Sequence, residues 1–222
     1  SMSYCSRTHN MDKSQILEAV KKARESRKRN FSQGFDIAIC LKDLDVSKNN
    51  IDDFIKLPMG RGKTLKVCAL VGPEMKTTVE KFCDLTITTD EFNNYEDTRK
   101  VRKLVREYEH FITQANLMPQ IAKTFGKYLG SIGKMPSPKA GQLIAPKANV
   151  ELIVRNLRDT IRLSAKKAPA INCSVGNEKM SDSDVAENIL SILDRLNQTL
   201  PRSSQNIRAV YVKTTMGGPI KI

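Results

Sequence analysis

Residues 60–64 read Gly-Arg-Gly-Lys-Thr and come nearest in this sequence to a phosphate-binding motif. A phosphate-binding loop of the GxxxxGK[ST] type needs a longer spacing, because its successive backbone amides must surround the phosphates. The other candidate, Gly72, is followed by Pro73, which has no amide hydrogen to donate to a pyrophosphate. We therefore predict neither a mononucleotide nor a dinucleotide site, and no cofactor.

Side chains that commonly perform nucleophilic or metal chemistry are few and widely spaced. His9 and His110 have no ligand-spaced partner, and no GxSxG sequence occurs. We interpret Asp52 and Asp53 as solvated charges, and we predict that the protein is not an enzyme and holds no metal. The cysteines form no CxxC pair and are predicted to be reduced and buried; they are Cys5, Cys40, Cys68, Cys83 and Cys173.

Positive charge dominates the composition. Lys and Arg number 37 against 24 Asp and Glu, so the net charge of the 222 residues is +13. This excess favours nucleic acid as the partner, with an acidic protein or lipid surface as the alternative. No apolar run approaches the roughly 20 residues that cross a bilayer, and residues 1–10 are too polar for a signal peptide. We predict a cytoplasmic protein without a membrane partner.

The two ends of the chain share one pattern. An amphipathic helix is predicted over residues 12–29, and its basic second half is either a solvated face or a phosphate-contacting edge. The Ser181 capping pattern predicts that another helix covers 182–198. Strands with alternating apolar residues are predicted over 35–41, 54–57, 161–165, 171–175 and 207–213. Together they indicate an antiparallel sheet with helices on one face.

The middle of the chain has a different pattern. A continuous apolar run at 65–71 predicts a strand buried on both faces. Residues 130–148, rich in Gly, Pro, Ser and Lys, are predicted to form a long basic loop. Shorter strands at 85–87 and 111–112 alternate with predicted helices at 73–83, 96–109, 119–129 and 150–160. This alternation indicates a parallel sheet with helices on both faces, although such a unit also leaves open an enzyme that binds an acidic metabolite.

The fold class predicted from both patterns is mixed, α+β and α/β. Residues 1–66 and 160–222 are expected to form one discontinuous domain with an antiparallel sheet and helices. Residues 67–159 are expected to form an inserted three-layer domain. In this arrangement Phe31 and Thr215 lie near each other despite their separation in the chain.

Six short segments, in order along residues 11–222, are similar to segments of the large-subunit L1 ribosomal proteins. Residues 212–217, Val-Lys-Thr-Thr-Met-Gly, resemble the carboxy-terminal signature of that family, and residues 28–33, Lys-Arg-Asn-Phe-Ser-Gln, resemble its amino-terminal RNA-facing segment. The other similar segments are 57–63, 114–119, 133–136 and 205–211. The intact glycine-rich crossing and the short amino-terminal region resemble the archaeal branch.

This resemblance implies a protein that binds structured RNA, with a Rossmann-like inserted domain that holds no nucleotide. The implied partners are the large ribosomal subunit, 23S-type ribosomal RNA of the mobile stalk near the tRNA exit site, deacylated tRNA bound transiently, and its own messenger RNA, which it would repress. The implied RNA contacts of the first domain are Lys28, Arg29, Phe31, Ser32, Thr214, Thr215, Met216 and Gly217. Those of the second domain are Lys134 and Lys139.

The residue types fit this role. A threonine hydroxyl can bond a ribose 2′-hydroxyl, Gly217 would let the backbone approach the ribose, and Phe31 and Met216 would offer apolar contact to sugar or base. The alternative is that Phe31 and Met216 are core residues.

The sequence departs from the family pattern at three places. Residues 130–133 lack the arginine usual before the Lys-Met-Pro motif, so one basic contact of the second domain is missing. Gly218 stands where a proline is expected, and Gly34 stands where a small hydroxyl residue is common. These departures put one RNA hydrogen bond and the local backbone after Gly217 in doubt.

Overall fold

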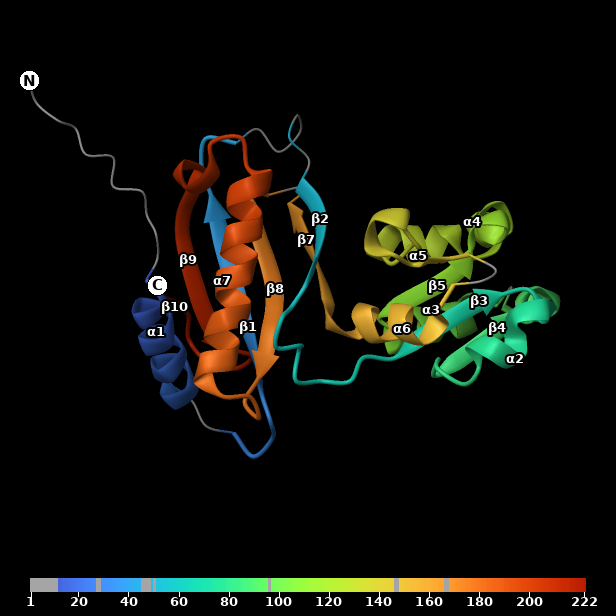
Figure 1. Cartoon of the computed structure of the whole chain (residues 1–222), viewed down its shortest axis with the longest axis horizontal. Helices are drawn as coiled ribbons and strands as arrows, with labels where there is room; N and C mark the ends of the chain where they lie inside the picture. The colour runs from blue at the N-terminus through green and yellow to red at the C-terminus, as the bar shows by residue number, and fades with distance from the viewer. Residues whose placement is uncertain are drawn as a thin grey trace, which may run out of the picture. The chain divides into compact units, whose positions relative to one another are not determined.

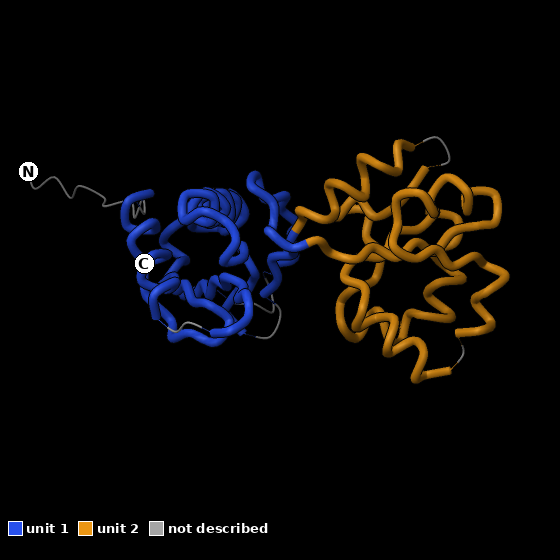
Figure 2. Tube along the Cα trace, turned by 90° about the horizontal axis from the view of Figure 1, so that it is seen from below, with its two compact units in different colours: residues 1–63, 161–222 blue, residues 64–160 orange. Residues whose placement is uncertain are grey.

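The computed structural model describes residues 12–26, 29–44, 49, 51–95, 97–145, 148–165 and 168–222. The chain forms two compact units (Figure 2): unit 1 combines Ser1–Lys63 with Ile161–Ile222, and unit 2 is Thr64–Thr160. These boundaries lie within three residues of the ones expected from the sequence. That either unit folds without the other remains a prediction.

Unit 1 is built on an antiparallel sheet with two helices on one face (Figure 1). The helices are α1 (Lys13–Ser26) and α7 (Asp182–Thr199). The strand order is β10-β9-β1-β8, formed by Ile220–Lys221, Ile207–Thr214, Gly34–Leu41 and Ala170–Asn177. A separate two-stranded sheet pairs β2 (Ile51–Lys56) with β7 (Thr160–Ala165). The predicted antiparallel arrangement is confirmed.

Burial alternates along β1, which explains why only one face of the sheet is covered. Phe35, Ile37 and Ile39 are buried, while the residues between them are partly exposed. The buried side chains join those of α1 and α7 in one apolar core. Ser181 caps α7 by accepting a hydrogen bond from the amide of Asp184, as its sequence pattern predicts.

Two adjacent aspartates connect β2 to its neighbours. Arg162 of β7 donates two hydrogen bonds of 2.6 Å to the Asp52 carboxylate, and Arg195 of α7 donates one of 2.6 Å to Asp53. The Arg195 guanidinium holds the pKa of Asp53 below its usual value, because a hydrogen bond to the ionised form stabilises it. The interpretation of these carboxylates as solvated charges was therefore wrong.

Unit 2 contains a parallel sheet of four strands in the order β4-β3-β5-β6. These strands are Leu85–Thr88, Val67–Val71, His110–Gln114 and Leu143–Ile144. Its helices are α2 (Lys76–Val79), α3 (Thr98–Glu107), α4 (Met118–Thr124), α5 (Gly126–Ile132) and α6 (Val150–Asp159). Short 3-10 turns connect them, including η1 (Pro73–Met75), η2 (Thr89–Tyr95) and η4 (Pro138–Ala140).

Successive residues of the central strand β3 face opposite layers. Cys68 and Leu70 pack with apolar residues of α3, α4 and α5. Val67, Ala69 and Val71 pack with those of α2 and α6. Every residue of β3 is buried, so the prediction of a strand covered on both faces, and with it the three-layer arrangement, is confirmed.

Several predicted element boundaries were wrong. The helix expected over 73–83 is a 3-10 turn followed by α2, which ends at Val79. The helix expected over 119–129 is interrupted at Phe125, whose buried ring packs edge-on against Phe92 at 5.2 Å. The loop expected over 130–148 contains the end of α5, η4 and the edge strand β6. Two residues are too few for β6 to show a periodic pattern.

The split of unit 1 predicts that its two pieces fold without the insertion. We expect a chain in which a short Gly-Ser linker joins Lys63 to Ile161 to unfold cooperatively, because a short connection has a small loop-closure entropy. It should also keep the preference for folded RNA that is proposed below. Circular dichroism melting and an RNA titration measure both. RNA preference in isolated residues 64–160, with none in the joined pieces, would contradict both the domain map and the site.

Candidate nucleic-acid interface

The register of the unit 1 sheet brings together two segments that are far apart in the sequence. Phe35 at the start of β1 pairs with Thr214 at the end of β9. Just beyond this pair, the amide of Thr215 donates to the Gly34 carbonyl at 3.0 Å, and the Gly34 amide donates to the Thr215 hydroxyl at 3.1 Å. The pairing places Gly34, three residues after Phe31, in contact with Thr215, as the predicted neighbourhood of residues 31 and 215 requires.

Gln33 is buried beneath this junction and holds it in place. Its side-chain carbonyl accepts a hydrogen bond of 3.0 Å from the Met216 amide, and its side-chain amide donates to the Glu178 carboxylate at 3.2 Å. The backbone amide of Gln33 donates to the same carboxylate at 2.8 Å. Arg24 of α1 then donates to the Glu178 carbonyl at 2.6 Å. The turn at 214–217 is therefore tied to three other segments of unit 1.

Gly217 lies where no side chain fits. A Cβ atom there would collide with the Thr214 hydroxyl and come within 2.7 Å of the Ser26 hydroxyl. Thr214 is fully buried, and no hydrogen-bond partner for its hydroxyl lies among the described residues. The missing side chain of Gly217 thus points into the protein, so packing explains the glycine and the approach of RNA does not. Thr214 was expected to contact RNA, but its buried side chain packs beneath the turn instead.

Two apolar side chains remain exposed at this junction. Phe31 is 55% exposed and Met216 is 48% exposed, which excludes the alternative that they are core residues. Arg29 and Thr215 are also exposed, and the Ser32 hydroxyl donates to the Asn177 side chain at 2.5 Å. Lys28 lies outside the described residues. We call Arg29, Phe31, Ser32, Thr215, Met216 and Gly217 the Phe31–Met216 surface.

Sequence reasoning missed the residues that support this surface. Gln33 was part of a recognised motif, but no pattern in one sequence marks it as buried or pairs it with Glu178, 145 residues away. Arg24 was read only as part of a basic helix edge, yet it donates three hydrogen bonds inside unit 1, to Glu178, Met180 and Asp182.

Lys134 and Lys139 in unit 2 have different surroundings. The Lys134 ammonium donates to the carbonyls of Val105 and Tyr108 at 3.0 Å each, and to the Glu109 carboxylate at 3.1 Å. With only 17% of its side chain exposed, it caps the last carbonyls of α3. Lys139 is exposed, and within the described part of the chain only its backbone amide is bonded, to the Ser137 hydroxyl.

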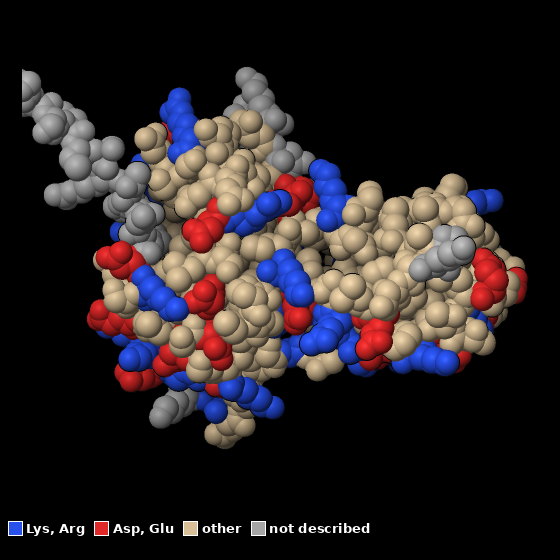
Figure 3. Space-filling model, in the orientation of Figure 1, with Lys and Arg blue, Asp and Glu red and all other residues tan. Residues whose placement is uncertain are grey.

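Charge is mixed rather than uniform on the face of unit 1 that Figure 3 presents, where Lys and Arg alternate with Asp and Glu. The described residues contain no group of His, Cys, Asp and Glu able to hold a metal ion, and no helix there is long and apolar enough to cross a membrane. Burial raises the pKa of the Cys83 and Cys173 thiols to about 12, so both are protonated and unreactive near neutral pH.

Comparison with known proteins adds a consistent set of relatives. The model of the ribosomal protein L1p/L10e family matches residues 20–218. The chain is 39% identical over 210 residues to the large ribosomal subunit protein uL1 of Nanoarchaeum equitans, covering 93% of this chain and 98% of that protein. For the proteins of the same name from Methanocella arvoryzae and Pyrococcus abyssi, the identity is 39% and 37% over 217 residues. Those matches cover 96% and 95% of this chain, and 100% and 96% of the relatives.

Proposed function

The chain belongs to the ribosomal protein L1 family, and from this premise we propose that it is a constituent of the large ribosomal subunit that binds folded ribosomal RNA. Both the family and its archaeal type were expected from the sequence motifs and are confirmed. The family is one of ribosomal proteins and not a class of enzymes.

We assign the RNA contact to the Phe31–Met216 surface. The observation that carries this assignment is the exposure of Phe31 and Met216 on a turn that buried hydrogen bonds hold in one conformation. An exposed aromatic ring can stack on a base or contact a ribose, and a positioned turn loses little conformational entropy on binding. Arg29 would contribute a phosphate contact. The Thr215 hydroxyl donates to the Gly34 carbonyl at 3.3 Å and would use its remaining lone pair to accept from a ribose hydroxyl.

The same surface would serve the finer roles that the family resemblance implies. A messenger RNA with a similar folded element would compete for it, which is the basis for the proposed repression of the protein's own translation. The proposal also places the chain on the mobile stalk, where deacylated tRNA would be a transient partner. In unit 2, Lys139 is free to contribute an RNA contact, whereas we assign Lys134 a structural role because its ammonium is already bound.

The two alternative functions are an enzyme and a basic module that binds a lipid or protein surface. An enzyme is not supported by the family, which is one of ribosomal proteins, and burial keeps the Cys83 and Cys173 thiols protonated, so neither is a ready nucleophile. A basic module for a lipid or protein surface would need charge but no exposed turn of defined geometry. The RNA experiment below separates the second from our proposal, because charge alone gives no preference between RNA folds.

We expect the whole chain to bind a folded ribosomal RNA fragment better than an unstructured RNA of equal length, and to keep that preference between about 50 and 200 mM salt. Replacing Phe31 by alanine should weaken binding of the folded fragment about 10- to 100-fold, since an aromatic contact to a base contributes about 1–3 kcal/mol. Fluorescence anisotropy titrations measure these affinities.

Matched controls come from apolar residues of similar exposure elsewhere. Leu152 on α6 is 55% exposed, so Leu152→Ala is the control for Phe31→Ala. Met59 in the crossing is 49% exposed, so Met59→Ala is the control for the corresponding variant Met216→Ala. Neither control should change the affinity for the folded fragment. If added salt weakens the binding of both RNAs equally and no preference for the folded fragment survives, only non-specific electrostatic binding remains and the proposal fails.

A further inference from the structure

Helix α3 of unit 2 presents a row of cations to solvent. Its apolar residues Val101, Leu104 and Val105 are buried against the sheet. Five of its ten residues are exposed and basic: Arg99, Lys100, Arg102, Lys103 and Arg106. No ion pair to any of these five side chains is found in the described part of the chain. Such a row is typical of a surface that meets phosphates.

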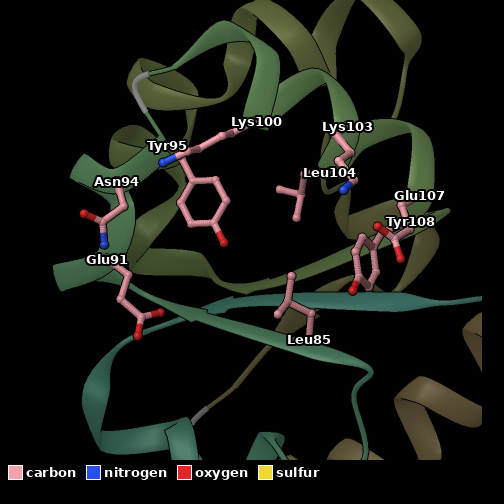
Figure 4. Close-up of a pocket in the computed structure, with 9 residues that line it drawn as sticks. All are labelled: Leu85, Glu91, Asn94, Tyr95, Lys100, Lys103, Leu104, Glu107 and Tyr108. Carbon is pink, nitrogen blue, oxygen red and sulfur yellow. The ribbon is translucent and has the colours of Figure 1, made fainter.

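A pocket of about 490 Å³ adjoins this row (Figure 4). Lys100 and Lys103 belong to both the row and the pocket lining, so the two features are continuous. Tyr95 of η2 and Tyr108, at the end of α3, stand on opposite sides of the pocket, with leucine side chains between them (Figure 4). The remaining lining residues are Leu85, Glu91, Asn94, Leu104 and Glu107.

The two acidic residues of the pocket are paired with lysines outside its lining. Glu107 accepts from Lys66 at 2.7 Å, and Glu91 lies 3.6 Å from Lys76. Lys66 holds the pKa of Glu107 below its usual value, so this carboxylate is ionised and engaged at neutral pH. The local field therefore remains positive, with Lys100 and Lys103 as its cations at the pocket.

We propose that this pocket and the α3 row form a second RNA site, which takes one unpaired base against the Tyr95 ring and its flanking phosphates on Lys100 and Lys103. The partly exposed Tyr95 ring supplies a stacking surface, which suits every base because each base has a π-face. Tyr108 is buried with Lys66 over its ring and forms part of the pocket wall. The Asn94 side chain carries both a donor and an acceptor for a base edge. The occupant is single-stranded RNA, because bases paired within a helix are not free to enter a pocket.

The site lies in unit 2 and does not depend on the Phe31–Met216 surface of unit 1, so either can fail alone. The probe is an unstructured RNA of about ten nucleotides that carries one 2-aminopurine, whose fluorescence falls when it stacks. In the whole chain, the double variant Lys100→Glu/Lys103→Glu should lower the affinity for this RNA at least about tenfold. It should also lower the slope of log affinity against log salt by about 1.4. Tyr95→Leu should abolish the fluorescence change, and Tyr95→Phe should keep it.

Lys123→Glu/Lys127→Glu is the matched control, because it changes the same charge at exposed lysines of α4 and α5. It should change the affinity less than about threefold, as expected for charges that touch no phosphate. Equal losses of RNA affinity in both double variants would mean that the RNA is attracted non-specifically, and would overturn the proposal. An unchanged 2-aminopurine signal would overturn the base pocket. Equal competition by polyglutamate would show a site for acidic protein instead.

Discussion

Replacing Gly217 by valine is expected to lower the affinity for the folded ribosomal RNA fragment at least about 100-fold, which corresponds to about 2.7 kcal/mol. The new side chain would collide with the Thr214 hydroxyl and with Ser26. Thr214 is fully buried and cannot move aside, so the turn must move instead. That movement would break the hydrogen bond from the Met216 amide to Gln33 and displace Met216 from its place in the proposed contact.

The same collision should reduce stability, though by less than a core cavity does, about 1–3 kcal/mol for overpacking. Gly218 provides the control for stability, because no atom of the described residues lies within 4 Å of a Cβ built there. Gly218→Val should therefore leave the melting temperature unchanged. A steric cause also predicts rescue: Gly217→Ala should bind RNA better when Thr214 is replaced by alanine as well. Normal RNA binding by a folded Gly217→Val chain would remove residues 214–217 from the proposed site.

Asn188→Leu is expected to destabilise unit 1 by about 2–4 kcal/mol, because the backbone groups that bond this side chain would lose their hydrogen-bond partner. Asn188 lies fully buried in α7. Its carbonyl accepts from the Met59 amide at 3.1 Å, and its amide donates to the carbonyls of Gly60 and Val175 at 2.8 Å each. One side chain thus fixes the start of the glycine-rich crossing to both α7 and β8.

The control for this prediction is Gln198→Leu, which makes the same amide-to-leucine change at an exposed position of the same helix. It should change the stability of unit 1 by less than about 0.5 kcal/mol. Because a chain with two units need not unfold in one step, hydrogen exchange of the β1 amides is the appropriate measurement. Equal protection of these amides in Asn188→Leu and Gln198→Leu would mean that the crossing is held by other contacts.

Lys134 and the basic residues of α3 have opposite surroundings. The motif pointed to Lys134, yet its ammonium is bound to two carbonyls and a carboxylate within unit 2. Helix α3, to which the motifs assigned no role, exposes five basic side chains beside a pocket. A lysine in a motif and a lysine on a helix have the same charge, and only their hydrogen-bond partners distinguish them.

The sequence by itself determined the elements whose pattern depends on local geometry. Alternating burial along a strand has a period of two residues, so Phe35–Leu41 could be assigned to a half-buried strand and 65–71 to a fully buried one. The Ser181 cap is likewise a contact within three residues. The ordered motifs identified the family, and the split of the first domain predicted that residues 31 and 215 would lie near each other.

Only the tertiary structure decided which side chains are free to meet a partner. Gln33 pairs with Met216 across 183 residues, Asn188 with Met59 across 129, and Asp53 with Arg195 across 142. Periodicity reports that a face is buried, but it does not say which distant group completes a hydrogen bond. The direction in which a Cβ atom at Gly217 would point and the burial of Thr214 could not be predicted for the same reason. Each depends on how β1, β9 and α1 pack together.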